Sequence, residues 1–164
     1  MTIIQAVNYY ADYYGIESEL IHAIIQHESS YNSNAVRFEP EINDKSIGLM
    51  QILISTGRSL GLVGTDAEIE KQLFIPEINI KYGTKYLHEL SKKYNNIRDI
   101  IASYNAGKPR YKLDGTYINQ KYVDKVLRTY TLLSSINDIN KIMPFAFLGL
   151  AINYIAKDFE KNKK

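Results

Sequence analysis

The sequence predicts a mainly α-helical chain that folds as one domain, residues 1–164, with a small irregular or β patch around residues 37–54. Apolar side chains recur at helical spacing through most of the chain, as in helices that bury one face. A length of 164 residues and a hydrophobic content of 45% fit a single domain with its own core and argue against disorder. No internal repeat, low-complexity segment or domain boundary divides the sequence.

Two helices are predicted at the start of the chain. Ile3–Tyr14 repeats apolar and aromatic residues at helical spacing, and Gly15 ends this pattern. The second helix contains Leu20–Glu28, and either Glu17 or Ser18 can cap it. Polar turn residues at 29–32 mark its end.

The segment that follows predicts the irregular or β patch. Arg37–Lys45 is polar and is expected to be a loop with short strands. Ser46–Ile52 is too short and too rich in turn signals for a helix, so we expect a strand or turn that lines a site. Ser55 or Thr56 can then cap a short helix that ends at Gly61.

The second half of the chain is expected to be almost entirely helical. Pro76 is typical of a first helical position, Asn95 of a helix end, and Gly107 of a C-terminal cap. Residues 108–120 are expected to form a loop. The predicted helices are Glu77–Tyr94, Ile97–Tyr104, Tyr122–Asn137 and Asn140–Lys157.

The second helix places a carboxylate in line with its apolar face. Leu20, Ile24 and Glu28 follow one another at i, i+4, so Glu28 belongs to the core-facing stripe. Burial and the negative end of the helix dipole both raise the pKa of a carboxyl. A carboxyl that stays protonated near neutral pH can act as a general acid. The alternative is a last-turn Glu that bends out into solvent.

The net charge and the content of Cys, His and Tyr indicate which kinds of partner the chain can bind. A net charge of +2 does not indicate a nucleic-acid-binding protein, although it suits an anionic polymer such as the cell wall. The chain has no Cys, and His22, His27 and His88 do not show metal-ligand spacing, so no metal and no cofactor are expected. Fourteen Tyr offer flat faces suited to sugars or to ordinary packing. The first residues lack the features of a signal peptide.

Four short motifs occur along the chain in a definite order and at definite spacings. They are Glu28-Ser29 with Asn32-x-Asn34-Ala35; Gly48-Leu49-Met50-Gln51-Ile52 with Thr56-x-Arg58-x-Leu60-Gly61; Asn79-Ile80-x-x-Gly83-x-x-Tyr86-Leu87; and Ala102-x-Tyr104-Asn105-Ala106-Gly107, followed by a weaker Tyr122-Val123-x-Lys125-Val126. Together they resemble the catalytic domain of the soluble lytic transglycosylases, whose fold is similar to goose-type lysozyme. The resemblance covers residues 15–127 and leaves 128–164 as a helical C-terminal extension.

This resemblance implies a reaction on peptidoglycan glycan strands. Glu28 would protonate the β-1,4 bond between N-acetylmuramic acid and N-acetylglucosamine, then accept the proton of the muramyl C6 hydroxyl as that oxygen closes a 1,6-anhydro ring. Tyr104 matches a Tyr whose hydroxyl faces the Glu carboxyl. The residues expected to bind substrate are Ser29, Arg37, Gly48, Met50, Gln51, Tyr104, Asn105 and Tyr122. Gly48 could instead shape the backbone, and Met50 could fill the core.

Arg37 stands where the family usually has a small Ser, and the loop that follows is unusually charged. Its carboxylates, Glu39, Glu41 and Asp44, leave open a second acidic group that activates water. The main alternative is therefore a lysozyme-like hydrolase with Asp44 or Glu41 as its base. A second alternative is a non-catalytic wall-binding or assembly protein on the same fold.

The apolar run Ile142–Ala156 lies outside the resemblance and is shorter than a membrane-spanning helix. We expect it to pack on the domain, or else to dock a phage-particle or secretion-apparatus protein. Without a signal peptide, a virion or a secretion apparatus would deliver the chain to the periplasmic or extracellular side of the wall.

Overall fold

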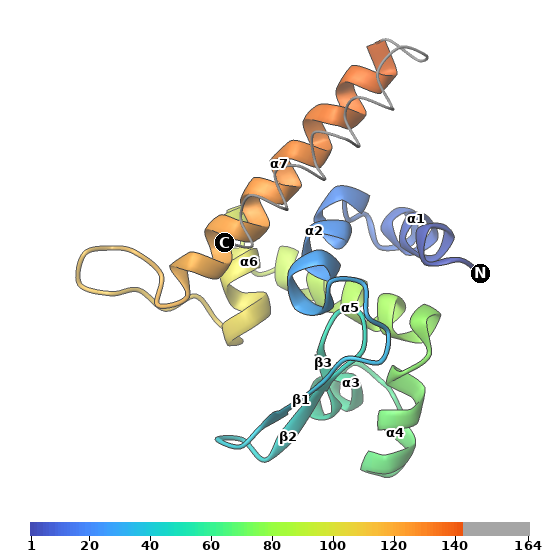
Figure 1. The fold of residues 1–164 in the computed structure, drawn as a ribbon. Helices are drawn as coiled ribbons and strands as arrows, with labels where there is room; N and C mark the ends of the chain where they lie inside the picture. Colours follow the sequence, from blue (N-terminus) through green and yellow to red (C-terminus); the bar gives the residue numbers. More distant parts are fainter. Residues whose placement is uncertain (143–164) are drawn as a thin grey trace.

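The structure is a computed structural model and describes residues 1–142. These residues form mainly helices around one small antiparallel sheet, which confirms the predicted fold class (Figure 1). The helices are α1 Ile3–Tyr14, α2 Ser18–Ser29, α3 Ile54–Ser59, α4 Asp66–Leu73, α5 Pro76–Ser91, α6 Ile97–Ala106 and α7 Gln120–Ile142; the strands are β1 Val36–Glu39, β2 Asp44–Ile47 and β3 Ile52–Leu53.

Helix α2 lies at the centre of the helical part of the molecule. It packs against α7 and α1, while α5 packs against α1 and α6. Its buried residues, Leu20, Ile21, Ala23, Ile24 and Ile25, form part of a single core cluster. Because one face of α2 is covered in this way, the end of the same face at Glu28 is held against the interior of the protein.

The sheet forms a second, smaller part of the molecule, drawn with α3 and α4 in the lower part of Figure 1. Its strand order is β1-β2-β3, and β1 pairs with β2 so that Arg37 lies opposite Ser46 and Glu39 opposite Asp44. Side chains alternate between the two faces of a strand, so Arg37 and Glu39 share one face. The hairpin therefore presents a basic and an acidic group on the same side.

Asn79 joins this sheet region to α5. Its side chain is fully buried, accepts a hydrogen bond from the Met50 amide at 2.8 Å, and donates to the carbonyls of Ile47 and Leu73 at 2.8 Å each. Gly48 lies directly against it, because a Cβ there would meet Asn79 Nδ2 at 2.5 Å. The Asn79 side chain thus fixes the turn between β2 and β3 through its hydrogen bonds to the backbone.

Several element boundaries differ from the prediction. Helix α4 was not predicted, although Thr65 and Glu68 form a capping box at its start. Helix α3 begins at Ile54, so neither Ser55 nor Thr56 caps it. Helix α5 ends at Ser91 rather than near Tyr94.

Helix α7 also runs further than expected. It continues without a break past Asn137 to Ile142, where a new helix was predicted to start at Asn140. Figure 1 shows it extending well beyond the rest of the molecule. Most of the predicted helix Asn140–Lys157 and nearly all of the apolar run Ile142–Ala156 lie outside the described residues. Within residues 1–142, no helix is both long and apolar enough to cross a membrane.

Candidate active site

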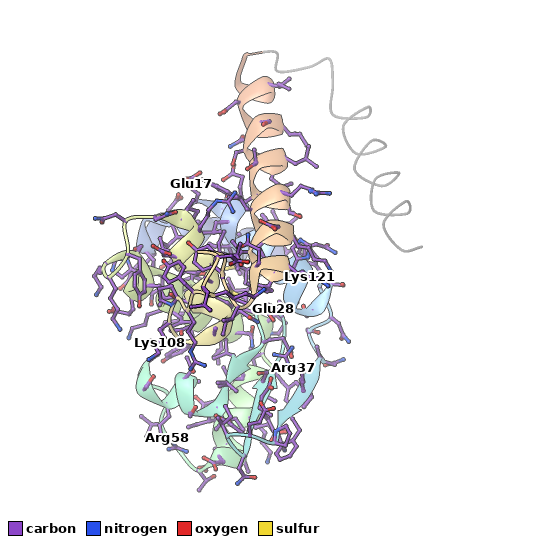
Figure 2. All side chains as sticks on the ribbon, turned by 90° about the vertical axis from the view of Figure 1, so that its left-hand side faces the viewer. Glu17, Glu28, Arg37, Arg58, Lys108 and Lys121 are labelled. Atoms are coloured by element: carbon purple, nitrogen blue, oxygen red, sulfur yellow. The ribbon has the colours of Figure 1, made fainter. Side chains whose placement is uncertain are left out.

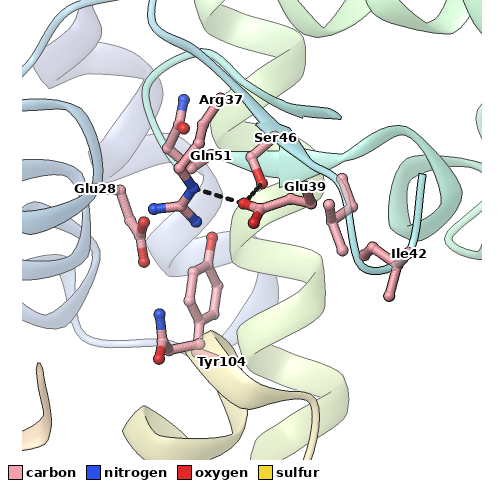
Figure 3. Close-up of a pocket in the computed structure, with 9 residues that line it drawn as sticks. Glu28, Arg37, Glu39, Ile42, Ser46, Gln51 and Tyr104 are labelled. Carbon is pink, nitrogen blue, oxygen red and sulfur yellow. Dashed lines mark hydrogen bonds and ion pairs between the residues drawn. The ribbon is translucent and has the colours of Figure 1, made fainter. Parts of the chain in front are cut away.

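A polar cavity of about 160 Å³ opens where α2 and α6 meet the sheet. Figure 3 shows its side chains converging from these three regions, with Glu28 on one side and the β-hairpin on the other. The lining residues are Glu28, Arg37, Glu39, Ile42, Ser46, Gln51, Leu53, Tyr104 and Asn105. Five of them, Glu28, Arg37, Gln51, Tyr104 and Asn105, were predicted from the sequence.

Glu28 lies in the last turn of α2 with its carboxyl directed into this cavity (Figure 3). Burial raises the pKa of this carboxyl above its ordinary value, in the direction that the sequence predicts. A hydrogen bond from Tyr122 and the positive charge of Arg37 act in the opposite direction, and the negative charge of Glu39 raises the pKa further. The site therefore favours a protonated carboxyl that faces a polar space.

The tyrosine that contacts Glu28 is Tyr122. Its hydroxyl, from the first turns of α7, donates to Glu28 Oε1 at 2.6 Å. The resemblance implies that the Tyr104 hydroxyl faces the carboxyl; in the structure this hydroxyl donates its hydrogen bond to the Met50 carbonyl at 2.8 Å. Burial and the nearby Glu28 charge hold the pKa of both tyrosines well above the ordinary value, so both remain neutral donors.

Arg37 and Glu39 form the wall opposite Glu28. Arg37 Nε donates to Glu39 Oε1 at 2.5 Å, and Ser46 Oγ donates to the same oxygen at 3.1 Å. The Arg37 side chain is 56% exposed and the Glu39 side chain 24%. Ser46 was not predicted as a site residue, although the strand pairing places it opposite Arg37. Glu39 was named only as one of three loop carboxylates that left open a second acidic group, and it lies on the same strand as Arg37.

Three other predicted substrate residues have structural contacts in the described chain. Ser29 Oγ donates to the carbonyls of Leu49 at 2.7 Å and Ile25 at 3.3 Å. Gly48 adopts a φ of 75°, a left-handed conformation that suits glycine. Met50 is fully buried, and its side chain packs where a Cβ on Gly83 would lie. The structure thus favours the alternative interpretation for Gly48 and Met50, while their substrate roles stay predictions.

Gln51 reaches the cavity through an unusual backbone conformation. Its φ is 47°, which is uncommon for a residue with a side chain. Its Nε2 donates to the carbonyls of Gly48 at 3.0 Å and Ala35 at 3.2 Å, so the amide is fixed before any substrate binds. Asn105 is fixed in a similar way, because its Oδ1 accepts from Asn119 Nδ2 at 3.0 Å.

The two carboxylates expected as alternative bases do not line the cavity. Asp44 accepts hydrogen bonds from the backbone amides of Lys45 at 2.7 Å and Ser55 at 3.1 Å. Glu41 is exposed in the hairpin turn. Among the described residues, the second carboxylate in the cavity is instead Glu39.

Residues 5–124 match the Transglycosylase SLT domain family. The chain belongs to this family. Because the matched range contains Glu28, Arg37, Gln51, Tyr104 and Tyr122, the cavity described above lies within the Transglycosylase SLT domain.

Relatives and a solved structure agree with this assignment. Membrane-bound lytic murein transglycosylase E of Buchnera aphidicola is 38% identical over 92 residues, which are 53% of this chain and 40% of that protein. Invasion protein IagB of Salmonella typhimurium is 30% identical over 125 residues, which are 76% of this chain and 74% of that protein. An inactive mutant of the lytic transglycosylase Slt from Pseudomonas aeruginosa superposes with a TM-score of 0.59 at 24% identity, covering 81% of this chain and 24% of that one.

The Slt match shows the fold and agrees with the predicted lysozyme-like architecture. This chain spans less than half of the Buchnera transglycosylase and about three quarters of IagB. In the part of the chain that the structure describes, no group of three or more His, Cys, Asp or Glu side chains could hold a metal ion.

Proposed function

We propose that the chain is a peptidoglycan lytic transglycosylase in which Glu28 acts first as general acid and then as general base. The observation that supports this most strongly is the buried Glu28 carboxyl, which faces a polar cavity and accepts a hydrogen bond from Tyr122 at 2.6 Å. The substrate follows from the family and from relatives named as lytic murein transglycosylases.

In the first step, protonated Glu28 gives its proton to the glycosidic oxygen between N-acetylmuramic acid and N-acetylglucosamine as the C1–O bond breaks. The Glu28 carboxylate that forms accepts the Tyr122 hydrogen bond, which is stronger to a charged acceptor. In the second step, the muramyl C6 oxygen bonds to C1 and its proton passes to Glu28. Glu28 is then protonated again, no water is consumed, and one carboxylate is sufficient.

This mechanism sets the pH dependence. Activity requires protonated Glu28, so the rate falls as the pH rises through the pKa of that carboxyl in the enzyme–substrate complex. Burial raises this pKa, which extends the active range toward neutral pH compared with an ordinary Glu.

The experiment is the release of soluble muropeptides from purified peptidoglycan by the wild type and Glu28→Gln. The variant keeps the side-chain shape and can still accept from Tyr122, so we expect a folded protein that binds the wall but releases nothing. Glu41→Gln is the matched control, since Glu41 is exposed and outside the cavity. Substantial release by purified Glu28→Gln would contradict the proposal, as would no release by the wild type.

We further propose that the chain acts on the periplasmic or extracellular side of the wall, delivered by a secretion apparatus or a virion. The relationship to a protein named as an invasion protein supports the secretion route more than the virion. Fractionation of the native host with an antibody to the chain would test this: exclusive recovery in the cytoplasm would contradict it.

A further inference from the structure

Arg37 has two carboxylates within the same cavity, and it pairs with only one of them. Its Nε donates to Glu39 at 2.5 Å, whereas no ion pair joins Arg37 to Glu28 in the described residues. Figure 3 shows the Arg37 guanidinium between the two acidic side chains, with its bond directed toward Glu39. The choice of partner matters, because a direct Arg37–Glu28 pair would favour the ionised form of Glu28. Ionised Glu28 has no proton to give to a glycosidic oxygen.

Glu39 is itself held in place on the hairpin. Ser46 Oγ donates to the same Oε1 that accepts from Arg37, and the pairing of β1 with β2 puts Arg37 opposite Ser46. One oxygen of Glu39 thus receives two donors from the same β-hairpin. This arrangement fixes the guanidinium by its Nε edge rather than leaving it free to turn toward α2.

Resting on the proposed function, we propose that Glu39 is a positioning residue: with Ser46 it holds the Arg37 guanidinium on the sheet side of the cavity and balances its charge, so that an arginine can bind the glycan beside Glu28 without ionising the general acid.

The charged and titratable groups around Glu28 agree with this role. They are Tyr122 from α7, Tyr104 from α6, and Arg37 and Glu39 from β1. Both tyrosines are neutral hydrogen-bond donors, so the only formal charges among these neighbours are those of Arg37 and Glu39. Arg37 lowers the Glu28 pKa and Glu39 raises it, so the two effects oppose each other.

The arrangement leaves most of the guanidinium available. A guanidinium has five N–H donors, and Glu39 uses the one on Nε. Arg37 lines the cavity, and its four Nη donors make no hydrogen bond to another described residue. They suit a carbonyl oxygen of the glycan, such as that of an N-acetyl group. Loss of Arg37 should therefore weaken substrate binding, whereas loss of Glu39 should change the ionisation of Glu28.

The test is the pH dependence of kcat and KM for wild type, Glu39→Gln, Arg37→Met and the double variant, on soluble glycan strands. In Glu39→Gln the unbalanced Arg37 charge lowers the Glu28 pKa, so the alkaline limb of the kcat–pH profile, where kcat falls as the pH rises, moves to lower pH. Arg37→Met moves the limb the other way and raises KM several-fold. The double variant lacks both charges, so we expect its alkaline limb of kcat at nearly the same pH as in the wild type, while its KM stays high.

Glu41→Gln is the matched control, because it removes the same charge two residues away on the exposed turn and leaves the limb unchanged. Ser46→Ala removes one donor to Glu39 without changing any charge, and we expect a smaller shift in the same direction as Glu39→Gln. Melting temperatures identify any variant that fails to fold.

If the alkaline limb of kcat lies at the same pH in Glu39→Gln as in Glu41→Gln, the inference is overturned. It is also overturned if the double variant has its alkaline limb at the same pH as Glu39→Gln. Either result with a wild type that still forms anhydro ends would leave the proposed function intact. A wild type without such ends would instead contradict the proposed function itself.

Discussion

Tyr122→Phe removes the hydroxyl that donates to Glu28 Oε1 at 2.6 Å and changes little else. A hydrogen bond to a charged acceptor is worth about 1.5–3 kcal/mol. A hydrogen bond to a neutral acceptor is worth about 0.5–1.5 kcal/mol, so in the mechanism this bond strengthens by about 1–1.5 kcal/mol when Glu28 loses its proton, and its loss raises the barrier by that difference. The expected fall in kcat is therefore about 5- to 13-fold.

The same change predicts a shift with a definite sign. The Tyr122 hydrogen bond lowers the pKa of Glu28, so its removal raises that pKa. Because the rate falls as pH rises through the pKa, the alkaline limb of kcat moves to higher pH. The assay is muropeptide release across a pH series, monitored by chromatography, at saturating substrate.

Tyr104→Phe is the matched control. It also removes one buried hydroxyl, but that hydroxyl donates to the Met50 carbonyl and not to Glu28. We expect a modest loss of stability, of about 1 kcal/mol, and an unmoved alkaline limb. Equal effects of the two substitutions on kcat and on the limb would refute the role given to Tyr122.

The remaining predictions concern stability and metal independence. Asn79→Ala removes three buried hydrogen bonds to backbone groups and should lower the free energy of unfolding by about 3–5 kcal/mol, measured by urea unfolding. Gly48→Ala should lower the melting temperature clearly more than Gly107→Ala. Both glycines have φ 75°, but a Cβ at Gly48 meets Asn79 and the Leu73 carbonyl, whereas a Cβ at Gly107 meets no atom within 4 Å. Equal melting temperatures of the two variants would count against this. Glu28→Gln should be more stable than the wild type at neutral pH, with the difference vanishing below the ordinary Glu pKa, because the raised pKa costs stability once the carboxyl ionises. Muropeptide release should persist in EDTA; loss with rescue by one divalent ion would contradict this.

The parts of the site that could be predicted follow from local periodicity. Leu20, Ile24 and Glu28 share one face of α2 because of the helical repeat alone, which predicts an inward carboxyl. The contacts of the folded protein decide between this position and the alternative of a Glu that bends out into solvent. The bounds of α1 were likewise predicted correctly, since Gly15 adopts the left-handed conformation expected after a helix.

Other parts depend on contacts between distant residues. The Tyr122 hydroxyl meets Glu28 across 94 positions of sequence, and nothing local distinguishes it from the other tyrosines. Glu39 lines the cavity because of the register in which β1 pairs with β2, and this register could not be predicted from the polar sequence of residues 37–45. The absence of α4 from the prediction is different: Thr65 and Glu68 carry a recognisable capping-box spacing, so the signal was present in the sequence.

In the proposed mechanism one carboxylate, Glu28, cleaves the glycan without water. The most direct test is digestion of purified peptidoglycan in ¹⁸O-labelled water, followed by mass spectrometry of the released muropeptides. We predict 1,6-anhydromuramyl ends, each one water lighter than a hydrolysed end and free of ¹⁸O. Reducing ends that carry ¹⁸O would contradict the account and show that the chain is a hydrolase, with Glu39 as the carboxylate in the cavity to examine as its base.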